Sequence, residues 1–148
     1  MLPKFKSQKG FTLIEVIVVI ALLAILATIV LVAINPAQNS QDARNTKRRA
    51  DVLQILNAVN QYYVANGSFP THMPASGVTS DLKDSGASGD VCAGIVTAYI
   101  AALPYDTGGS YTDCSDYDTK YKIGLDASGK RVTVSAPGAE GTTISVTR

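Results

Sequence analysis

The chain of 148 residues has few charged residues, one histidine and no tryptophan. Charged residues make up 17% of it, against roughly 25% in ordinary soluble domains. They are also unevenly placed, because 26 consecutive residues between Glu15 and Asp42 carry no charge. Eleven of the 12 glycines lie at or after Gly67. These features argue against a single well-mixed soluble globule, and also against a disordered or collagen-like chain.

The residues that build common catalytic sites are missing. His72 is the sole histidine, so a Ser–His–Asp triad or a histidine-based zinc site has nothing to build on. There is no P-loop and no GxSxG motif, and the string SGASGD is a weak glycine loop with no strand expected before it. We therefore predict a protein that is not an enzyme and needs no catalytic cofactor.

Residues 16–34 form a long hydrophobic run in which only Thr28 is not apolar. As a helix, these residues would extend about 28 Å, close to the roughly 30 Å of bilayer hydrocarbon. The apolar residues lie all round the helix, which is typical of a membrane span. The preceding basic residues Lys4, Lys6 and Lys9 favour a cytoplasmic N-terminus.

Two other interpretations of this run are weaker. A buried core helix would need more surrounding chain than remains. A secretory signal peptide has a shorter apolar region and a small-x-small cleavage site, which Ala33, Ile34 and Asn35 do not provide.

Glu15 is an acidic residue at the front of this run. A carboxylate near hydrocarbon costs several kcal/mol unless it is paired or neutralised, and so it indicates a function. The alternative is that Glu15 lies at headgroup depth, where water solvates it.

The string KGFTLIEVIVVIALLAI around Glu15 resembles the N-terminus of type IV prepilins and type II secretion pseudopilins, the class III signal. The resemblance implies processing between Gly10 and Phe11 by a prepilin peptidase that also methylates Phe11. Glu15 would then be the fifth mature residue. In that family this glutamate is thought to neutralise the N-terminal amine of a neighbouring subunit, which gives it an assembly role.

The resemblance implies a structural subunit of a type IV pilus or a pseudopilus-like filament. Its partners would be identical or related pilin subunits, the peptidase, an assembly ATPase, an inner-membrane platform protein and the lipid membrane. The subunit would cross the cytoplasmic membrane once, and after assembly it would lie in an extracytoplasmic filament. The alternatives are a monomeric membrane-anchored extracytoplasmic binding domain and a domain secreted after the apolar run.

The division of the chain follows from these segments. We expect a leader over 1–10, a transmembrane and assembly helix over 11–35, an amphipathic continuation over 36–66 and a globular head over 67–148. Pro36 predicts a kink or local melting rather than a stop. Asn66-Gly67 predicts the end of the helix. The core-facing stripe is expected to contain Val52, Ile55, Leu56, Val59, Tyr62 and Tyr63.

The head is expected to be α+β, with a small antiparallel sheet packed on the helix. Residues 71–90 are predicted to be loop and residues 93–103 a short helix. Strands are expected over 120–125, 131–135 and 142–147, joined by short turns into a meander. Its apolar face would cover Leu56 and Val59, and comprises Tyr121, Ile123, Leu125, Val132, Val134, Ile144 and Val146.

Three further predictions concern the polar residues of this part. Cys92 and Cys114 allow one disulfide in an oxidising compartment; the alternative is two reduced thiols. Loop oxygens of Asp106, Asp113, Asp116 and Asp118 suit calcium, although aspartates in loops usually serve turns. The basic cluster at 44–49 is expected to be solvated or paired with acids of neighbouring subunits. Anionic lipid is a weaker alternative, and nucleic acid is disfavoured as a direct ligand.

Overall fold

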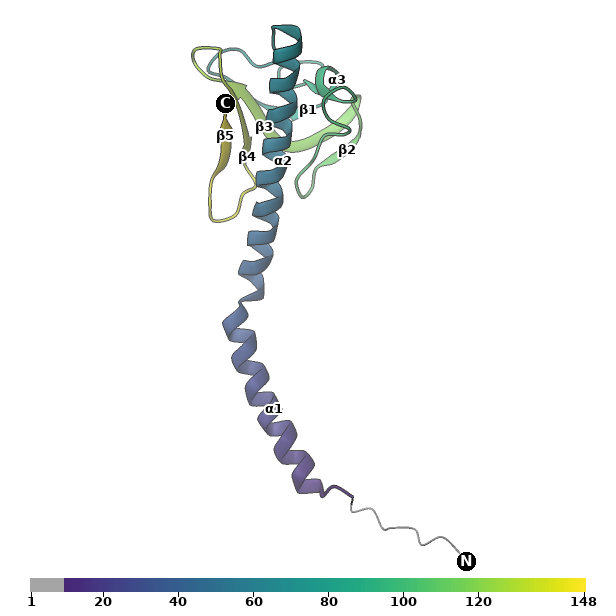
Figure 1. Cartoon of the computed structure of the whole chain (residues 1–148), viewed down its shortest axis with the longest axis vertical. Helices are drawn as coiled ribbons and strands as arrows, with labels where there is room; N and C mark the ends of the chain where they lie inside the picture. The colour runs from purple at the N-terminus through teal and green to yellow at the C-terminus, as the bar shows by residue number, and fades with distance from the viewer. Residues whose placement is uncertain (1–9) are drawn as a thin grey trace, which may run out of the picture. The chain divides into compact units, whose positions relative to one another are not determined.

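A computed structural model of the protein describes residues 10–148, and most of the expected leader, residues 1–9, lies outside them (Figure 1). The chain divides between Ser40 and Gln41 into two units. The first contains α1 (Leu13–Ile34) and the first turn of α2 (Pro36–Asn66). The second contains the rest of α2 and the other elements, which are β1 (Thr79–Lys83), α3 (Cys92–Ile95), β2 (Ser110–Asp113), β3 (Asp116–Leu125), β4 (Val132–Ala136) and β5 (Ile144–Thr147).

The helix α1 is apolar around its whole circumference, and none of its residues is buried. Its one neutral polar residue, Thr28, donates its hydroxyl back to the carbonyl oxygen of Ile25 at 2.7 Å, so it needs no outside partner. Among residues 10–148 one helical stretch has the length and composition to cross a membrane, and the span lies near the N-terminus. The predicted apolar helix is therefore confirmed.

One residue, Asn35, separates α1 from α2. Its backbone is left-handed, with φ 42° and ψ 76°, and the Asn35 side chain accepts from the N–H of Gln38 at 3.4 Å. Pro36 has no N–H to donate and begins the next helix. The interruption predicted at Pro36 is confirmed, and the helix resumes at once.

The helix α2 buries one face in the head. Val52, Ile55, Leu56 and Val59 are buried, as predicted, whereas Tyr62 is half-buried and Tyr63 is exposed. The helix ends at Asn66, because Gly67 adopts φ 71° and donates its N–H to the carbonyl of Tyr63 at 2.8 Å. The apolar stripe and the C-terminal stop are thus confirmed, and the two tyrosines pack less deeply than expected.

The sheet has five antiparallel strands in the order β1-β3-β4-β5, with β2 also paired to β3. The expected meander is present as β3, β4 and β5. The expectation of loop over 71–90 was wrong for residues 79–83, which form β1 directly before the glycine loop, and holds for the rest. This strand, TSDLK, buries only Leu82 and therefore shows no apolar alternation.

The helix expected over 93–103 was also wrong in length. Helix α3 stops at Ile95, since Thr97 takes a positive φ of 71° that cannot continue a helix. The predicted apolar face of the sheet is largely confirmed. Leu125 and Val146 are partly buried, and the fully enclosed members are Tyr121, Ile123, Val132, Val134 and Ile144.

Cys92 and Cys114 form a disulfide, as predicted, with their Cα atoms 5.4 Å apart. It ties α3 to the turn that follows β2. A bridge that closes 22 residues stabilises the folded state by about 3 kcal/mol, mainly by restricting the unfolded chain.

Candidate processing and assembly site at the start of α1

The Gly10–Phe11 bond lies in an exposed segment ahead of α1. Neither residue is helical, and the Phe11 side chain is 84% exposed. A Cβ added at Gly10 would meet no described atom within 4 Å, so there is open space where a side chain would project. A protease needs an accessible bond outside a helix, and Gly10 and Phe11 are both exposed and non-helical.

Thr12 and Glu15 form a reciprocal cap at the start of α1. The Glu15 N–H donates to the Thr12 hydroxyl at 3.3 Å, and the Thr12 N–H donates to the Glu15 carboxylate at 3.5 Å. The cap satisfies two N–H groups that the first helical turn leaves free, and the helix dipole favours the negative charge there. The spacing Thr-x-x-Glu is the sequence pattern that predicts such a cap.

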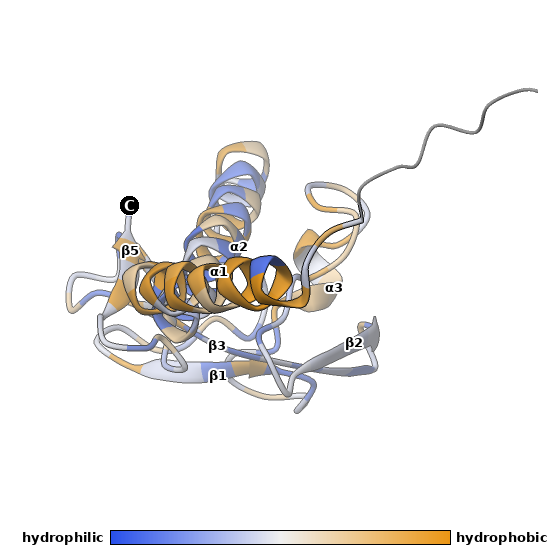
Figure 2. Cartoon of the chain, turned by 90° about the horizontal axis from the view of Figure 1, so that it is seen from below, coloured by the Kyte–Doolittle hydropathy of each residue, from blue (hydrophilic) through white to orange (hydrophobic). Residues whose placement is uncertain are grey.

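The exposed carboxylate of Glu15 is flanked by apolar side chains. Glu15 lines a shallow groove together with Phe11, Val16, Val19 and Ile20. Seen by hydropathy, α1 is apolar except for this acid near its start (Figure 2). An exposed apolar helix can pack against similar helices. A single carboxylate near its start can pair with a cationic group, which fixes the position of that group along the helix.

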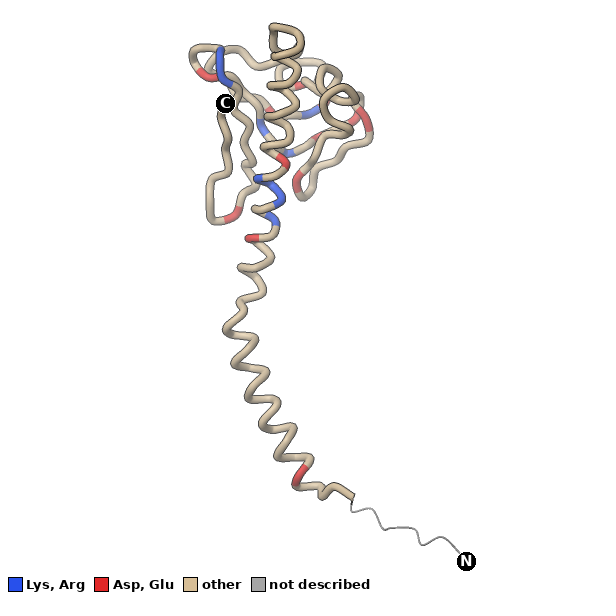
Figure 3. The backbone as a smooth tube through the Cα atoms, viewed as in Figure 1, with Lys and Arg blue, Asp and Glu red and all other residues tan. Residues whose placement is uncertain are grey.

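The basic cluster at 44–49 lies on α2 (Figure 3). Two of its arginines, Arg44 and Arg48, pair with carboxylates of the same chain. Arg44 Nε donates to Glu140 at 2.6 Å, and Arg48 Nε donates to Asp106 at 2.8 Å. Arg48 also donates to Glu140 at 3.1 Å, and it is buried with Asp106. The expectation that this cluster is solvated, or paired with acids of neighbouring subunits, was therefore wrong for Arg44 and Arg48.

These contacts change how the acid titrates. The hydrogen bond from Arg44, and then that from Arg48, lower the pKa of Glu140 from its ordinary value to about 2. The same bonds raise the pKa of both arginines. Both guanidinium groups are occupied by carboxylates, which leaves them poorly placed to bind phosphate.

Three of the four aspartates predicted as calcium ligands accept hydrogen bonds from different residues. Asp106 accepts from Arg48, Asp113 from Ser115, and Asp118 from Lys120. Hydrogen bonds from Ser115 and Lys120 lower the pKa of Asp113 and Asp118 respectively. Asp116 pairs with Asp113 in the β2–β3 register.

Across residues 10–148 no three acidic, histidine or cysteine side chains are grouped so that they could hold a metal ion. Calcium binding stays a prediction.

The glycine loop that follows β1 is held by a hydrogen bond within the loop, because the N–H of Gly86 donates to the Asp90 carboxylate at 2.9 Å.

Two buried phenols serve the fold rather than chemistry. Tyr121 of β3 donates to Asp51 of α2 at 2.7 Å, and Tyr117 donates to Asp90 at 2.6 Å. Burial, followed by these hydrogen bonds, raises the pKa of both tyrosines well above the usual range. Neither phenol is therefore poised to ionise.

Comparison with known proteins adds one match. Residues 5–31 match the family model of the prokaryotic N-terminal methylation motif. No curated protein and no solved structure matches the chain significantly. The matched segment ends inside α1 and contains Gly10, Phe11, Thr12 and Glu15.

The motif marks a family of pilin-type proteins that are generally structural rather than enzymatic, and it implies peptidase processing and assembly with pilin subunits. An apolar N-terminal helix fits membrane anchoring followed by incorporation into a surface filament. Residues 5–31 therefore match the class III prepilin-like signal found in type IV pilins and pseudopilins, and the α+β architecture that contains them is pilin-like.

Proposed function

We propose that this protein is a structural subunit of a type IV pilus or type II secretion pseudopilus-like filament. It is cleaved after Gly10, methylated on Phe11 and polymerised through α1. The leader is residues 1–10, the assembly helix 11–35, its amphipathic continuation 36–66 and the head 67–148. The N-terminus lies in the cytoplasm before assembly, and an assembly ATPase and a platform protein drive the polymerisation.

The observation that carries this proposal is the exposure of the apolar side chains of α1. A methylation motif covers its start, and all its apolar side chains are exposed in the single chain. In the bilayer, lipid covers these side chains, and in a filament the same side chains of other subunits replace the lipid. Packing of α1 against copies of itself therefore explains why the helix is apolar on every side.

Glu15 gives the packing a register. Cleavage creates a cationic amine on Phe11, and a carboxylate of another subunit at the same depth is its natural counter-charge. The local bond from Thr12 to Glu15 is long, at 3.5 Å, so it costs little to replace it by an ion pair. Leaving either charge unpaired among apolar helices would cost free energy. The subunits are therefore expected to align along the helix axis so that Glu15 of one meets the amine of another.

The test is to express the full chain in a bacterium with a prepilin peptidase and a filament assembly system, and to analyse both membranes and sheared filaments. We expect the wild-type N-terminus to be methylated Phe11. Gly10→Leu should retain Met1 and form no filaments. Glu15→Leu should be inserted and cleaved normally, but its filament yield should fall by about tenfold or more.

Asp42→Asn is the matched control for Glu15, because it also removes one exposed carboxylate from a helix and should assemble normally. An intact Met1 on the mature wild-type protein would support the monomeric anchored domain instead, and a start after residue 34 would support secretion. Normal filaments from Glu15→Leu would refute the assembly role of the acid.

A further inference from the structure

The segment that contains both cysteines carries charges of one sign only. Residues 84–119 contain six aspartates and no Lys, Arg or His, although the whole chain has a net charge of +1. The six are Asp84, Asp90, Asp106, Asp113, Asp116 and Asp118. Such an excess of one sign creates a local negative potential, which the near-neutral total of the chain hides.

Four of these aspartates have no cation beside them. Asp106 and Asp118 pair with Arg48 and Lys120 respectively. The ion pairs formed by residues 10–148 include none of the other four, which are Asp84, Asp90, Asp113 and Asp116. Their uncompensated charges follow β1, precede α3 and occupy the β2–β3 turn.

The disulfide of the chain lies within this acidic segment, and its two ends differ in exposure. Cys92 is 0% exposed and belongs to the buried core, as does its neighbour Val91. Cys114 is partly exposed, in the turn between β2 and β3. Thiol–disulfide exchange begins when a thiolate reaches one of the two sulfur atoms, so Cys114 is the end that a reagent can reach.

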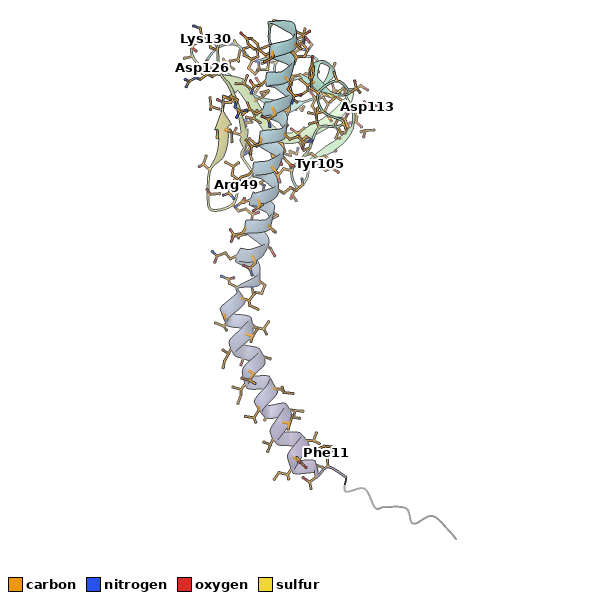
Figure 4. The ribbon with its side chains drawn as sticks, viewed as in Figure 1. Phe11, Arg49, Tyr105, Asp113, Asp126 and Lys130 are labelled. Atoms are coloured by element: carbon orange, nitrogen blue, oxygen red, sulfur yellow. A yellow bond between two sulfur atoms is a disulfide. The ribbon has the colours of Figure 1, made fainter. Side chains whose placement is uncertain are left out.

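Two exposed carboxylates flank Cys114 in this turn. Asp113 (Figure 4) precedes it directly, and Asp116 follows two residues later. Ser115 donates both its N–H and its hydroxyl to Asp113 at 2.7 Å, which lowers the pKa of Asp113 and keeps it ionised at neutral pH. Because adjacent Cα atoms are about 3.8 Å apart, both charges act on an incoming reagent within roughly one Debye length at 0.1 M salt, ~10 Å.

We propose that thiol–disulfide exchange on this chain takes place at Cys114, and that Asp113 and Asp116 select cationic thiols over anionic ones. This inference goes beyond the proposed function and does not depend on it, because it concerns the head of the single chain. The acidic turn attracts a positive charge next to the attacking sulfur and repels a negative one. The disulfide is therefore protected from anionic thiols and open to thiols that carry a positive charge.

The exchange consists of two displacements. A thiolate attacks Sγ of Cys114, a new S–S bond forms, and the bond to Cys92 breaks, so that Cys92 leaves as a thiolate and takes up a proton from water. A second thiolate then attacks the reagent sulfur of this mixed disulfide and releases Cys114. Two reagent thiols are thereby oxidised to their disulfide, and the protein disulfide is reduced to two thiols. Release of Cys92 as an anion among apolar side chains is unfavourable, which makes the exchange slow overall.

The first test compares three thiols of similar length: 2-aminoethanethiol is cationic, 2-mercaptoethanol neutral and 2-mercaptoethanesulfonate anionic. Loss of the disulfide is followed in the full chain in detergent at low salt, as the initial rate per thiolate. Asp113→Asn keeps an acceptor for Ser115, and together with Asp116→Asn it removes both charges. Asp126→Asn is the matched control, since Asp126 accepts from Ser128 in the same way but lies on the opposite side of the head from Asp113 (Figure 4).

We expect the preference for the cationic over the anionic thiol to be about fivefold greater in the wild type than in Asp113→Asn/Asp116→Asn. Asp126→Asn should behave as the wild type. In 1 M salt the Debye length falls to ~3 Å, and the difference between the wild type and the double variant should vanish. An equal preference in these two proteins at low salt would overturn the inference. A rate that does not depend on thiol concentration would also overturn it, because reduction would then require prior unfolding.

The second test locates the attack. In a buffer of 2-aminoethanethiol and its own disulfide the mixed disulfide accumulates, and acid quenching, digestion and mass spectrometry show which cysteine carries it. We expect the adduct on Cys114 and a free thiol at Cys92. An equal or larger amount of adduct on Cys92 would contradict the proposal. Both tests use the unassembled chain, so neither outcome affects the proposed filament function.

Discussion

The two units of the chain treat apolar side chains in opposite ways. In α1 every leucine, isoleucine and valine is exposed, whereas in the second unit 19 hydrophobic residues form one buried cluster. The charges differ in the same way, since Glu15 in α1 has only a cap at 3.5 Å while Arg48 is enclosed by carboxylates. The head thus buries its apolar side chains within one chain, whereas the apolar side chains of α1 stay exposed in the single chain.

The largest expected effect of a single substitution concerns the charges that close the head. Arg48→Ala would leave Asp106 buried without its cation, which costs about 3–5 kcal/mol of unfolding free energy. Chemical denaturation of the full chain in detergent, followed by near-ultraviolet circular dichroism, measures this loss. Filament registry should not enter the result, because no filaments are assembled in the assay.

The neighbouring Arg49 supplies the control for Arg48. It is exposed on the same helix (Figure 4), and Arg49→Ala should change the unfolding free energy by no more than about 0.5 kcal/mol. The double variant Arg48→Met/Asp106→Leu removes both charges and should be more stable than Arg48→Ala alone. Equal losses from Arg48→Ala and Arg49→Ala would show that the pair contributes nothing to the head.

A pair of leucines compares the two units directly. Leu56→Ala removes a side chain that is 1% exposed and should cost about 2–5 kcal/mol in the same unfolding assay. Leu23→Ala makes the identical change in α1, where the side chain is exposed, and should leave the unfolding of the head unchanged. In the filament assay the order should reverse, with Leu23→Ala weakening assembly at unchanged head stability. If Leu23→Ala destabilised the head as much as Leu56→Ala, the division into two units would be wrong.

The predictable parts of this protein are those with a local pattern. The apolar run specifies α1, and Asn66-Gly67 specifies the end of α2. The alternation in KYKIGL specifies the C-terminal part of β3, and that in RVTVS specifies most of β4. The processing motif is local too, since Gly10, Phe11 and Glu15 lie within six residues. The less predictable parts depend on tertiary contacts.

The strand β1 has only Leu82 buried and is held by pairing with β3, which no local periodicity reveals. The partners of Arg48 lie 58 and 92 residues away, so the basic cluster looked free in the sequence. Burial of an arginine is also against the usual preference for exposure, and only the fold shows which carboxylates compensate it.

The smallest expected effect is a loss of head stability in acid. Because the pKa of Glu140 falls from 4.5 to about 2 on folding, the unfolded chain binds more protons between these values. The contribution of Glu140 to the unfolding free energy is therefore fully present above about pH 4.5 and is lost as the pH falls towards 2.

Unfolding free energies measured across this range should fall more steeply for the wild type than for Glu140→Gln. The variant starts less stable at neutral pH, because Arg44 and Arg48 lose a counter-charge, and the two proteins should converge in acid. Asp118 and Asp126, whose pKa values are also lowered in the fold, titrate in both proteins and cancel in the comparison. Parallel pH profiles for the wild type and Glu140→Gln would show that Glu140 is not held by its arginines, and the closed network of the head would then be reduced to Arg48 and Asp106.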